Sequence, residues 1–440
     1  MTVEHDLAAE AYVYYFPLVF DLGEVERSVT VGFGALAAAP FNTFAHGDRL
    51  STDNEKFVSV NNDTIYSIAQ LDLSNGPLLL SVPPTGDRYF VLQFVDAWTN
   101  NFAYVGTRAT GNQGGDFLIV PPGAGGETDD GGPRRIEAPT TIVSIVGRFA
   151  CDGTDDIPAV RALQEQLTVT PVLRSLVPPR GVVEPAAVDA DLAFWEKARA
   201  FSLAYPPAER DVQYAARFAE LGLTDAESPF VEASSDLRER LVAGTAGGEA
   251  LIAAASRAGA PGESWSSLPH AFDYNVDFFG VGTIDSPEWT ITDPTRRFLT
   301  RAFAAKVGLW GNHGYEATYA QTFLDADGDA LDGTKAYTIR FDTPPPVDAF
   351  WSITMYDLPD YYLVANPIGR YSVGDRTPGI VRAADGSITL TLSHDEPTDA
   401  DARANWLPAP AAPFRPMIRL YSPRESVLDG TYRLPSIEKA

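Results

Sequence analysis

Two regions of short β-type runs enclose a region of helical spacing, and this order restricts the fold more than any other feature. From Asn61 to about residue 170, runs such as PLLLSVP, RYFVLQFVDAW and TTIVSIVGRFACD are separated by turn residues. The last part of the chain, with AYTIRF, AFWSITMY, SITLTLS and MIRLYSP, has the same character. Several short strands at close spacing indicate a sandwich or a barrel, so we predict two β-rich modules.

Residues 6–30, which alternate small, aromatic and acidic residues at the start of the chain, predict a leading helix. The region between the two β regions is also predicted to be helical, because runs such as VDADLAFWEKARAFSLAY and PTRRFLTRAFAAKVGLW have helical spacing, with Asp or Ser near several starts. We therefore predict an α+β fold, mainly β, with two β-sandwich or jelly-roll-like modules and a helical insert between them. The predicted domains are a β-rich domain with a leading helix (1–170), a helical insert (171–310) and a jelly-roll-like domain (311–440).

The charge of the chain limits its partners. The 59 Asp and Glu outnumber the 33 Lys and Arg, for a formal charge of −26, which opposes binding to nucleic acid or to an anionic membrane. Cys151 is the single cysteine, which excludes an intrachain disulfide and a zinc site built on thiolates. The N-terminal segment lacks the features of a secretion signal, and no apolar run is long enough to span a membrane. We expect a cytoplasmic protein.

The segment VNNDTIYS (60–67) places amides, a carboxylate and a phenol at the start of the first sheet. Asn61, Asn62 and Asp63 could position a polar substrate or a water molecule, and Tyr66 could donate a proton. The structural alternative is an Asx-turn that satisfies local backbone groups, because Asn and Asp are common in turns.

The run GDRYFVLQFVDAWTNNFAYVGTRATG (86–111) predicts a strand with charged residues on an apolar face. Strand alternation places Arg88 and Asp96 on the same side as large apolar groups. A buried charge needs a partner, so we expect Asp96 to pair with Arg88 or Arg108, or to act as a base whose pKa is changed by burial. Asn101 is interpreted as a turn residue or a ligand contact.

Two C-terminal runs, PPPVDAFWSITMYD (344–357) and NPIGRYSVGDR (366–376), combine aromatic residues with an arginine. Such a set suits a planar or acidic ligand through cation–π and bidentate contacts. The alternative is a set of core aromatics with one structural arginine. The candidate residues are Trp351, Tyr356, Asn366, Arg370 and Tyr371.

Neither a metal nor a cofactor is expected. The run DADGDALDG (325–333) is superficially similar to a calcium loop, but Gly328 stands at its fourth position and Ala336 at its twelfth. The histidines show no metal-ligand spacing, and His313, in WGNHGYEATY, is interpreted as structural. The chain has no G-x-S-x-G elbow, Walker loop or complete dinucleotide fingerprint.

Long motifs in a fixed order resemble two families, domain of unknown function 1254 followed by domain of unknown function 1214. AYVYYFPLV, NNDTIYSIAQLDLSNGPLLLSVP and DRYFVLQFVDAWTNNFAYVGTRATG carry the first resemblance; DADGDALDGTKAYTIRF, PPPVDAFWSITMYD and NPIGRYSVGDR carry the second. The resemblance covers roughly residues 8–170 and 310–435 and implies a β-rich two-domain architecture without defining a reaction. Positions on these motifs include Asp63, Tyr66, Arg88, Tyr89, Asn101, Arg108, Trp351, Tyr356, Asn366, Arg370 and Tyr371.

We expect a metal-independent enzyme that acts on a small polar or aromatic-containing molecule, with hydrolase, lyase or isomerase chemistry. Asp63 or Asp96 would be the base, and Tyr66 or Tyr356 the acid. A noncatalytic protein that binds a saccharide or metabolite is the alternative, a metal-dependent enzyme is a weaker one, and homo-oligomeric assembly stays open. The residues expected to bind substrate are Asn61, Asn62, Arg88, Asn101, Arg108, Trp351, Asn366, Arg370 and Tyr371.

Overall fold

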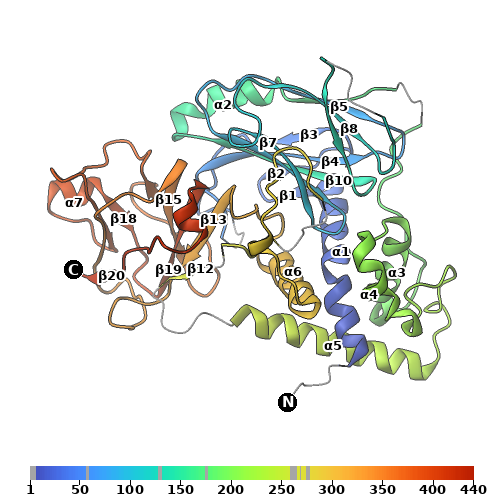
Figure 1. Cartoon of the computed structure of the whole chain (residues 1–440). Helices are drawn as coiled ribbons and strands as arrows, with labels where there is room; N and C mark the ends of the chain where they lie inside the picture. Colours follow the sequence, from blue (N-terminus) through green and yellow to red (C-terminus); the bar gives the residue numbers. More distant parts are fainter. Residues whose placement is uncertain are drawn as a thin grey trace.

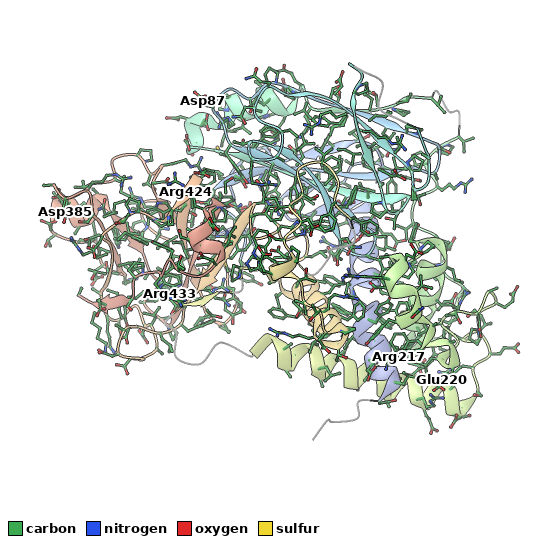
Figure 2. All side chains as sticks on the ribbon, in the orientation of Figure 1. Asp87, Arg217, Glu220, Asp385, Arg424 and Arg433 are labelled. Carbon is green, nitrogen blue, oxygen red and sulfur yellow. The ribbon has the colours of Figure 1, made fainter. Side chains whose placement is uncertain are left out.

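The computed structural model describes residues 6–55, 59–126, 131–173, 177–257, 265–267, 269–273 and 278–440. It confirms the predicted α+β class, with two β-sandwich modules and helices between them (Figure 1). None of its described helices has the length and apolarity needed to cross a membrane. Charged side chains such as Asp385 and Glu220 project from the periphery, as Figure 2 shows.

The N-terminal module packs a five-stranded sheet, ordered β3-β4-β10-β6-β7, against a four-stranded sheet, ordered β11-β5-β8-β9. Leucines of β5 and phenylalanines of β6 belong to the core between the sheets. The strands are β3 (Phe44–His46), β4 (Thr64–Asp72), β5 (Leu78–Val82), β6 (Phe90–Asp96), β7 (Asn101–Gly106), β8 (Gly115–Val120), β9 (Arg134–Glu137), β10 (Ile142–Ala150) and β11 (Thr168–Pro171).

The C-terminal module repeats this topology strand for strand. Its sheets are ordered β12-β13-β19-β15-β16 and β18-β17-β14-β20, so β12 to β20 take the places of β3 to β11 in the same chain order. Among the described strands of the two modules, the only parallel pairs are β8 with β9 and β17 with β18, which are equivalent. The strands are β12 (Ser266–Ser267), β13 (Ala317–Gln321), β14 (Tyr337–Phe341), β15 (Val347–Asp357), β16 (Ser372–Gly374), β17 (Ile388–Ser393), β18 (Trp406–Pro408), β19 (Phe414–Pro423) and β20 (Ile437–Lys439).

A short helix also precedes the last strand of each module. Residues Ile157–Gln164 form α2 before β11, and Glu425–Leu428 form α8 before β20. The equivalence is seen in the strand order, which the hydrogen-bond ladders define.

Most of the remaining helices form a separate core beside the N-terminal module. The long helix α1 (Leu7–Thr30) starts at the N-cap Asp6, whose side chain accepts a hydrogen bond from the amide of Ala8 at 3.3 Å. It contacts α3 (Ala193–Ala204), α5 and α6, and α5 crosses its foot in Figure 1. The other helices of this core are α4 (Val212–Ala216), α5 (Ser235–Arg257) and α6 (Pro294–Gly308), whereas α7 (Ala400–Ala404) lies between β17 and β18 in the C-terminal module.

Small residues allow α1 and α5 to approach closely. A Cβ atom at Gly244 would lie 2.4 Å from the Cβ of Ala8, and one at Gly248 would lie 2.4 Å from Cδ1 of Tyr12. The run AGTAGGEA in α5 therefore serves as a packing surface, although glycine lowers intrinsic helix propensity.

The strand β6 is buried on both faces, which strand alternation did not predict. Phe90, Leu92 and Phe94 face the core between the sheets, as expected. Val91 and Val95 on the opposite face are also buried, because the C-terminal module and the segment around residue 310 cover it. This covered face leads to the contact between the two modules.

Candidate functional site

Asn61 and Asp63 lie where the two modules meet, at the start of β4. The Asp63 carboxylate accepts hydrogen bonds from the hydroxyls of Ser352 at 2.7 Å and Tyr421 at 3.2 Å, both in the C-terminal module. Asn61 donates to the Tyr421 oxygen at 3.0 Å and to Thr64 at 2.9 Å. Asp63 is 4% exposed. This carboxylate therefore ties the modules together, whatever other role it has.

A second acid, in the C-terminal module, makes the equivalent bonds to the N-terminal module. Glu316, directly before β13, accepts hydrogen bonds from the Tyr89 hydroxyl at 2.9 Å and from Nε of Arg108 at 2.6 Å, both in the N-terminal module. Asp63 stands three residues before Tyr66, and Glu316 three residues before Tyr319. The two acids are thus equivalent in position, and each bonds to the other module.

Two buried arginines repeat this reciprocity. Arg148 is paired with Tyr66 across β10 and β4, and Arg419 with Tyr319 across β19 and β13. Nη2 of Arg148 donates to the Trp310 carbonyl oxygen at 2.9 Å, and Nη2 of Arg419 donates to the Ser59 carbonyl oxygen at 2.9 Å. We call this contact the seam, defined by Asp63, Tyr66, Arg148, Glu316, Tyr319 and Arg419. It resembles the self-complementary interface of a symmetric dimer.

The two carbonyl groups bound by these arginines belong to residues in the left-handed region. Trp310 has φ of 61° and Ser59 has φ of 53°, which costs energy for residues other than glycine. The guanidinium groups stabilise these conformations from the opposite module.

Three more predicted residues lie beside the seam. Tyr356 donates to the Val60 carbonyl oxygen at 2.7 Å and accepts from Arg419 at 2.7 Å. Asn62 accepts from the Ser372 hydroxyl at 3.2 Å, and the Tyr371 hydroxyl donates to the Asp53 carboxylate. The structure thus brings Asn61, Asn62, Asp63, Tyr66, Arg108, Tyr356 and Tyr371 to one contact between modules.

The expected pairing of Asp96 with Arg88 or Arg108 is wrong. Arg88 pairs with Asp156 at 2.5 Å, because it precedes β6 and lies near the start of α2. Asp96 instead caps the tight turn into β7 and accepts from the Asn100 amide at 2.8 Å. Burial raises the pKa of Asp96 to about 6, against the opposing effect of these hydrogen bonds.

The last three predicted residues lie within the C-terminal module. Trp351 is buried against Phe341, with ring centroids 4.9 Å apart. The Asn366 side chain accepts from the Arg370 amide at 2.9 Å, which closes a turn. The Arg370 guanidinium donates to the carbonyl oxygen of Trp406 at 2.9 Å. These contacts support the module's fold and do not reach the seam.

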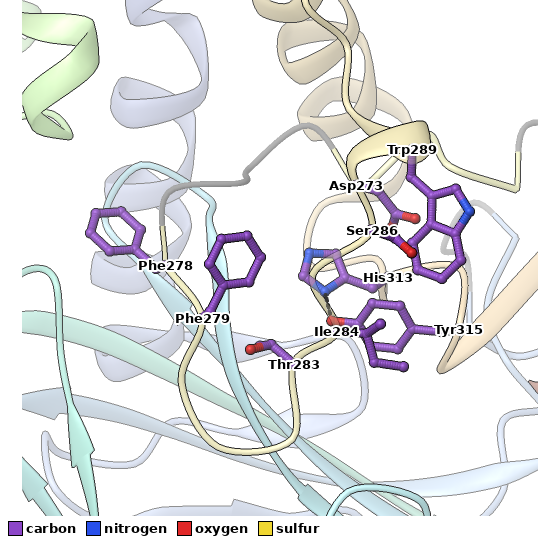
Figure 3. Close-up of a pocket in the computed structure, with 9 residues that line it drawn as sticks. All are labelled: Asp273, Phe278, Phe279, Thr283, Ile284, Ser286, Trp289, His313 and Tyr315. Carbon is purple, nitrogen blue, oxygen red and sulfur yellow. Dashed lines mark hydrogen bonds between the residues drawn. The ribbon is translucent and has the colours of Figure 1, made fainter.

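A hollow beside the seam is lined by residues that sequence reasoning missed or interpreted as structural. It encloses about 300 Å³, its open mouth included, between the segment 278–289 and the segment just before β13 (Figure 3). The residues that line it are Asp273, Phe278, Phe279, Thr283, Ile284, Ser286, Trp289, His313 and Tyr315.

His313 and Tyr315 form the polar base of the hollow. Nδ1 of His313 lies 2.5 Å from the Tyr315 hydroxyl oxygen, and the dashed line in Figure 3 marks this contact. Burial lowers the pKa of His313 to about 4, so the imidazole is neutral at pH 7. Burial raises the pKa of Tyr315, so the phenol keeps its proton. A neutral imidazole can accept the phenol proton.

A second histidine supports the wall of the hollow. Nδ1 of His270 lies 2.5 Å from the Asp273 carboxylate, whose other oxygen accepts from the Gly314 amide at 2.9 Å. Burial opposes protonation of His270, but the bond and charge of Asp273 prevail and raise its pKa. The Trp289 ring stacks between His270 and Tyr315, with centroids 4.9 Å and 5.7 Å away.

A smaller hollow of about 190 Å³, its open mouth included, is lined in part by Asn101 and Trp310. The Asn101 side chain donates to the Gly311 carbonyl oxygen at 2.9 Å. Both hollows therefore adjoin residues 309–316, the segment between α6 and β13. The run WGNHGY, with its two glycines and a histidine, is the sequence feature that could have indicated this segment as part of a site.

The acidic loop 325–329 holds the side chain of Lys439. Its Nζ lies 2.8 Å from the Asp327 carboxylate and 2.7 Å from that of Asp329. In the part of the chain that the structure describes, no group of three or more His, Cys, Asp or Glu is arranged to hold a metal ion.

The structure is that of an α+β protein with two equivalent sandwich modules. A hollow with a polar base lies beside the seam between them. Residues 41–171 match the family described as protein of unknown function (DUF1254), and residues 316–425 match protein of unknown function (DUF1214). The chain therefore belongs to the proteins that carry these two domains in this order, which confirms the resemblance read from the motifs.

One solved structure agrees on the fold. The chain is similar to the crystal structure of the VPA0106 protein from Vibrio parahaemolyticus, with a TM-score of 0.74, 21% identity and 99% of each chain covered. An uncharacterised protein from Burkholderia cenocepacia aligns with a TM-score of 0.43 and 14% identity over 98% of this chain and 88% of its own, too distant to support an inference. A search of curated proteins finds no match.

Proposed function

We propose that this protein is a hydrolase- or lyase-type enzyme that acts by acid–base chemistry on a small polar or aromatic-containing molecule in the hollow. The contact of 2.5 Å between His313 and Tyr315 at its base is the observation that carries the proposal. The seam residues Asp63 and Tyr66, the leading candidates from the sequence, do not line either hollow.

A proton relay follows from this geometry. A ligand hydroxyl or water that donates to the Tyr315 oxygen would pass its proton to Tyr315 as the phenol proton moves to Nδ1 of His313. With a pKa of about 4, His313 is too weak a base to hold this proton alone at pH 7, so the transfer would occur in the same step as attack of the oxygen on the substrate carbonyl carbon, whose oxyanion balances the charge of the imidazolium. The nearby Asp273 carboxylate favours the imidazolium, as its opposing effect on the His313 pKa shows. General acid–base steps of this kind contribute about 10²–10⁴-fold to a rate.

The test is turnover of uncharged esters, lactones and β-hydroxy carbonyl compounds no larger than p-nitrophenyl acetate. Hydrolysis is followed by proton release and dehydration by ultraviolet absorbance. We expect saturable turnover of at least one compound, reduced about 100-fold in Tyr315→Phe and His313→Gln. Phe323→Ala is the matched control, since Phe323 is 36% exposed and lies outside the hollow.

The pH profile adds a second readout. A neutral His313 is the proton acceptor, so kcat/KM falls only as the pH approaches about 4, where the imidazole becomes protonated. Rates in the wild type equal to those of Tyr315→Phe for every compound would refute the catalytic proposal. Saturable binding without turnover would favour the noncatalytic alternative.

We also propose a cytoplasmic location and a small-molecule ligand without a nucleic-acid or membrane partner. The single Cys151 and the formal charge of −26 support this part of the proposal.

A further inference from the structure

The charged groups nearest to the base of the hollow are already engaged with each other. Asp273 lies 2.5 Å from His270, and Arg108 lies 2.6 Å from Glu316. The Arg108 guanidinium also covers one face of the Tyr315 ring, 4.6 Å from its centroid, and donates to the Gly282 carbonyl oxygen at 2.6 Å. These charged side chains therefore already have partners of opposite charge before a ligand binds.

The lining itself contains no lysine or arginine among the described residues. The arginines expected to anchor an anion, Arg88 and Arg370, are held by Asp156 and by backbone carbonyl groups elsewhere. Two exposed acids, Asp285 and Glu288, flank the lining residue Ser286, whose hydroxyl donates to Glu288 at 2.9 Å, and they would repel an anion.

The mouth of the hollow is apolar. Phe279 is 48% exposed and Ile284 is 41% exposed, which is uncommon for large apolar side chains on this protein. In Figure 3, Phe278 and Phe279 stand across from His313 and Tyr315, so an apolar wall faces the polar base. Burial of such exposed rings against a ligand is favourable because it removes apolar surface from water.

We propose that the ligand is an uncharged molecule with an aromatic or apolar body and a hydroxyl or carbonyl group. The body would pack against Phe278 and Phe279, and the oxygen would reach the His313–Tyr315 pair. At the base a carboxylate would find no cation in the lining, and an ammonium would find only Asp273, which already pairs with His270, so either ion would lose hydration at a cost. This inference deepens the proposed function and rests on it.

Three molecules of similar shape provide the test at pH 7.5: benzyl alcohol, benzoate and benzylammonium. Their binding to the full chain is measured by calorimetry or ligand-detected NMR. We expect benzyl alcohol to bind at least about tenfold more tightly than either ion, because desolvation of an ion costs far more than desolvation of a hydroxyl that regains a hydrogen bond. Equal or tighter binding of benzoate or benzylammonium would overturn the inference and leave the hollow as a binding site.

Phe279→Ala and Phe323→Ala form a matched pair, since both side chains are exposed phenylalanines and only Phe279 lines the hollow. We expect about fivefold or greater weakening of benzyl alcohol binding in Phe279→Ala, as apolar contact area is lost, and no change in Phe323→Ala. Equal effects would contradict the placement of the ligand body. Absence of binding by all three molecules would overturn the proposed function together with this inference.

Discussion

Replacement of the two seam arginines tests whether each module stabilises a segment of the other module, the one before β4 or the one before β13. The substitutions are Arg148→Met and Arg419→Met, which keep the length of the side chain and remove its charge and its donors. Arg148 donates to Trp310 in the segment before β13, and Arg419 donates to Ser59 in the segment before β4. Each substitution should therefore loosen a loop in the opposite module.

The magnitude follows from the bonds that are lost. Each arginine makes one hydrogen bond of 2.9 Å to a backbone carbonyl group in the other module. A hydrogen bond from a charged group contributes about 1.5–3 kcal/mol, and a factor of ten in an equilibrium corresponds to about 1.4 kcal/mol. Opening of the loop in the opposite module should become about 10- to 100-fold more frequent.

Native-state hydrogen exchange measures this opening. In Arg148→Met, amides of residues 311–316 should exchange faster while those of residues 59–63 stay closer to the wild-type rate. Arg419→Met should give the converse pattern. Lysine at each position is the charge-preserving control. Faster exchange confined to the module that carries the substitution would refute the reciprocal arrangement.

Three further results are expected. In the folded protein the pKa of His313 is about 4, below its ordinary value of 6.5, so the folded state loses stability as pH falls from 6.5 toward 4. In urea unfolding, the contribution of His313 to the free energy of unfolding should be about 2 kcal/mol smaller at pH 5 than at pH 7, and this difference should be absent in His313→Gln. Gly311→Ala should lower the unfolding free energy by about 1–3 kcal/mol, since its Cβ would lie 2.1 Å from Cζ of Phe272; an unchanged urea midpoint would contradict this clash. Burial raises the pKa of Cys151 to about 11, so iodoacetamide at pH 8 should alkylate it about 100-fold more slowly than an exposed thiol; rapid labelling of the folded chain would show otherwise.

The β-rich modules and many helices could be predicted because their signals are local. The strand β10, read from TTIVSIVGRFACD, and the helix α1 both follow from periodicity and turn residues within a short window. The pairing of Arg88 with Asp156 could not be predicted in this way, because it depends on where α2 lies after folding. The same limit applies to Asp63, whose partners Ser352 and Tyr421 are nearly 300 or more positions away.

The polar motifs that stand out in the sequence lie at the seam, which is why they did not indicate the hollow. Asp63 and Tyr66 hold the same positions in the N-terminal module as Glu316 and Tyr319 hold in the C-terminal module, and both pairs belong to the contact between modules.

The chain departs from this equivalence between the first two strands of each module. The connection from β3 to β4 spans residues 47–63, whereas the connection from β12 to β13 spans residues 268–316 and carries α6. Both hollows adjoin that longer connection. Sites commonly form on loops that a rigid scaffold positions. In this chain the repeated part supplies the scaffold, and the insertion that has no counterpart supplies the residues proposed to meet the ligand.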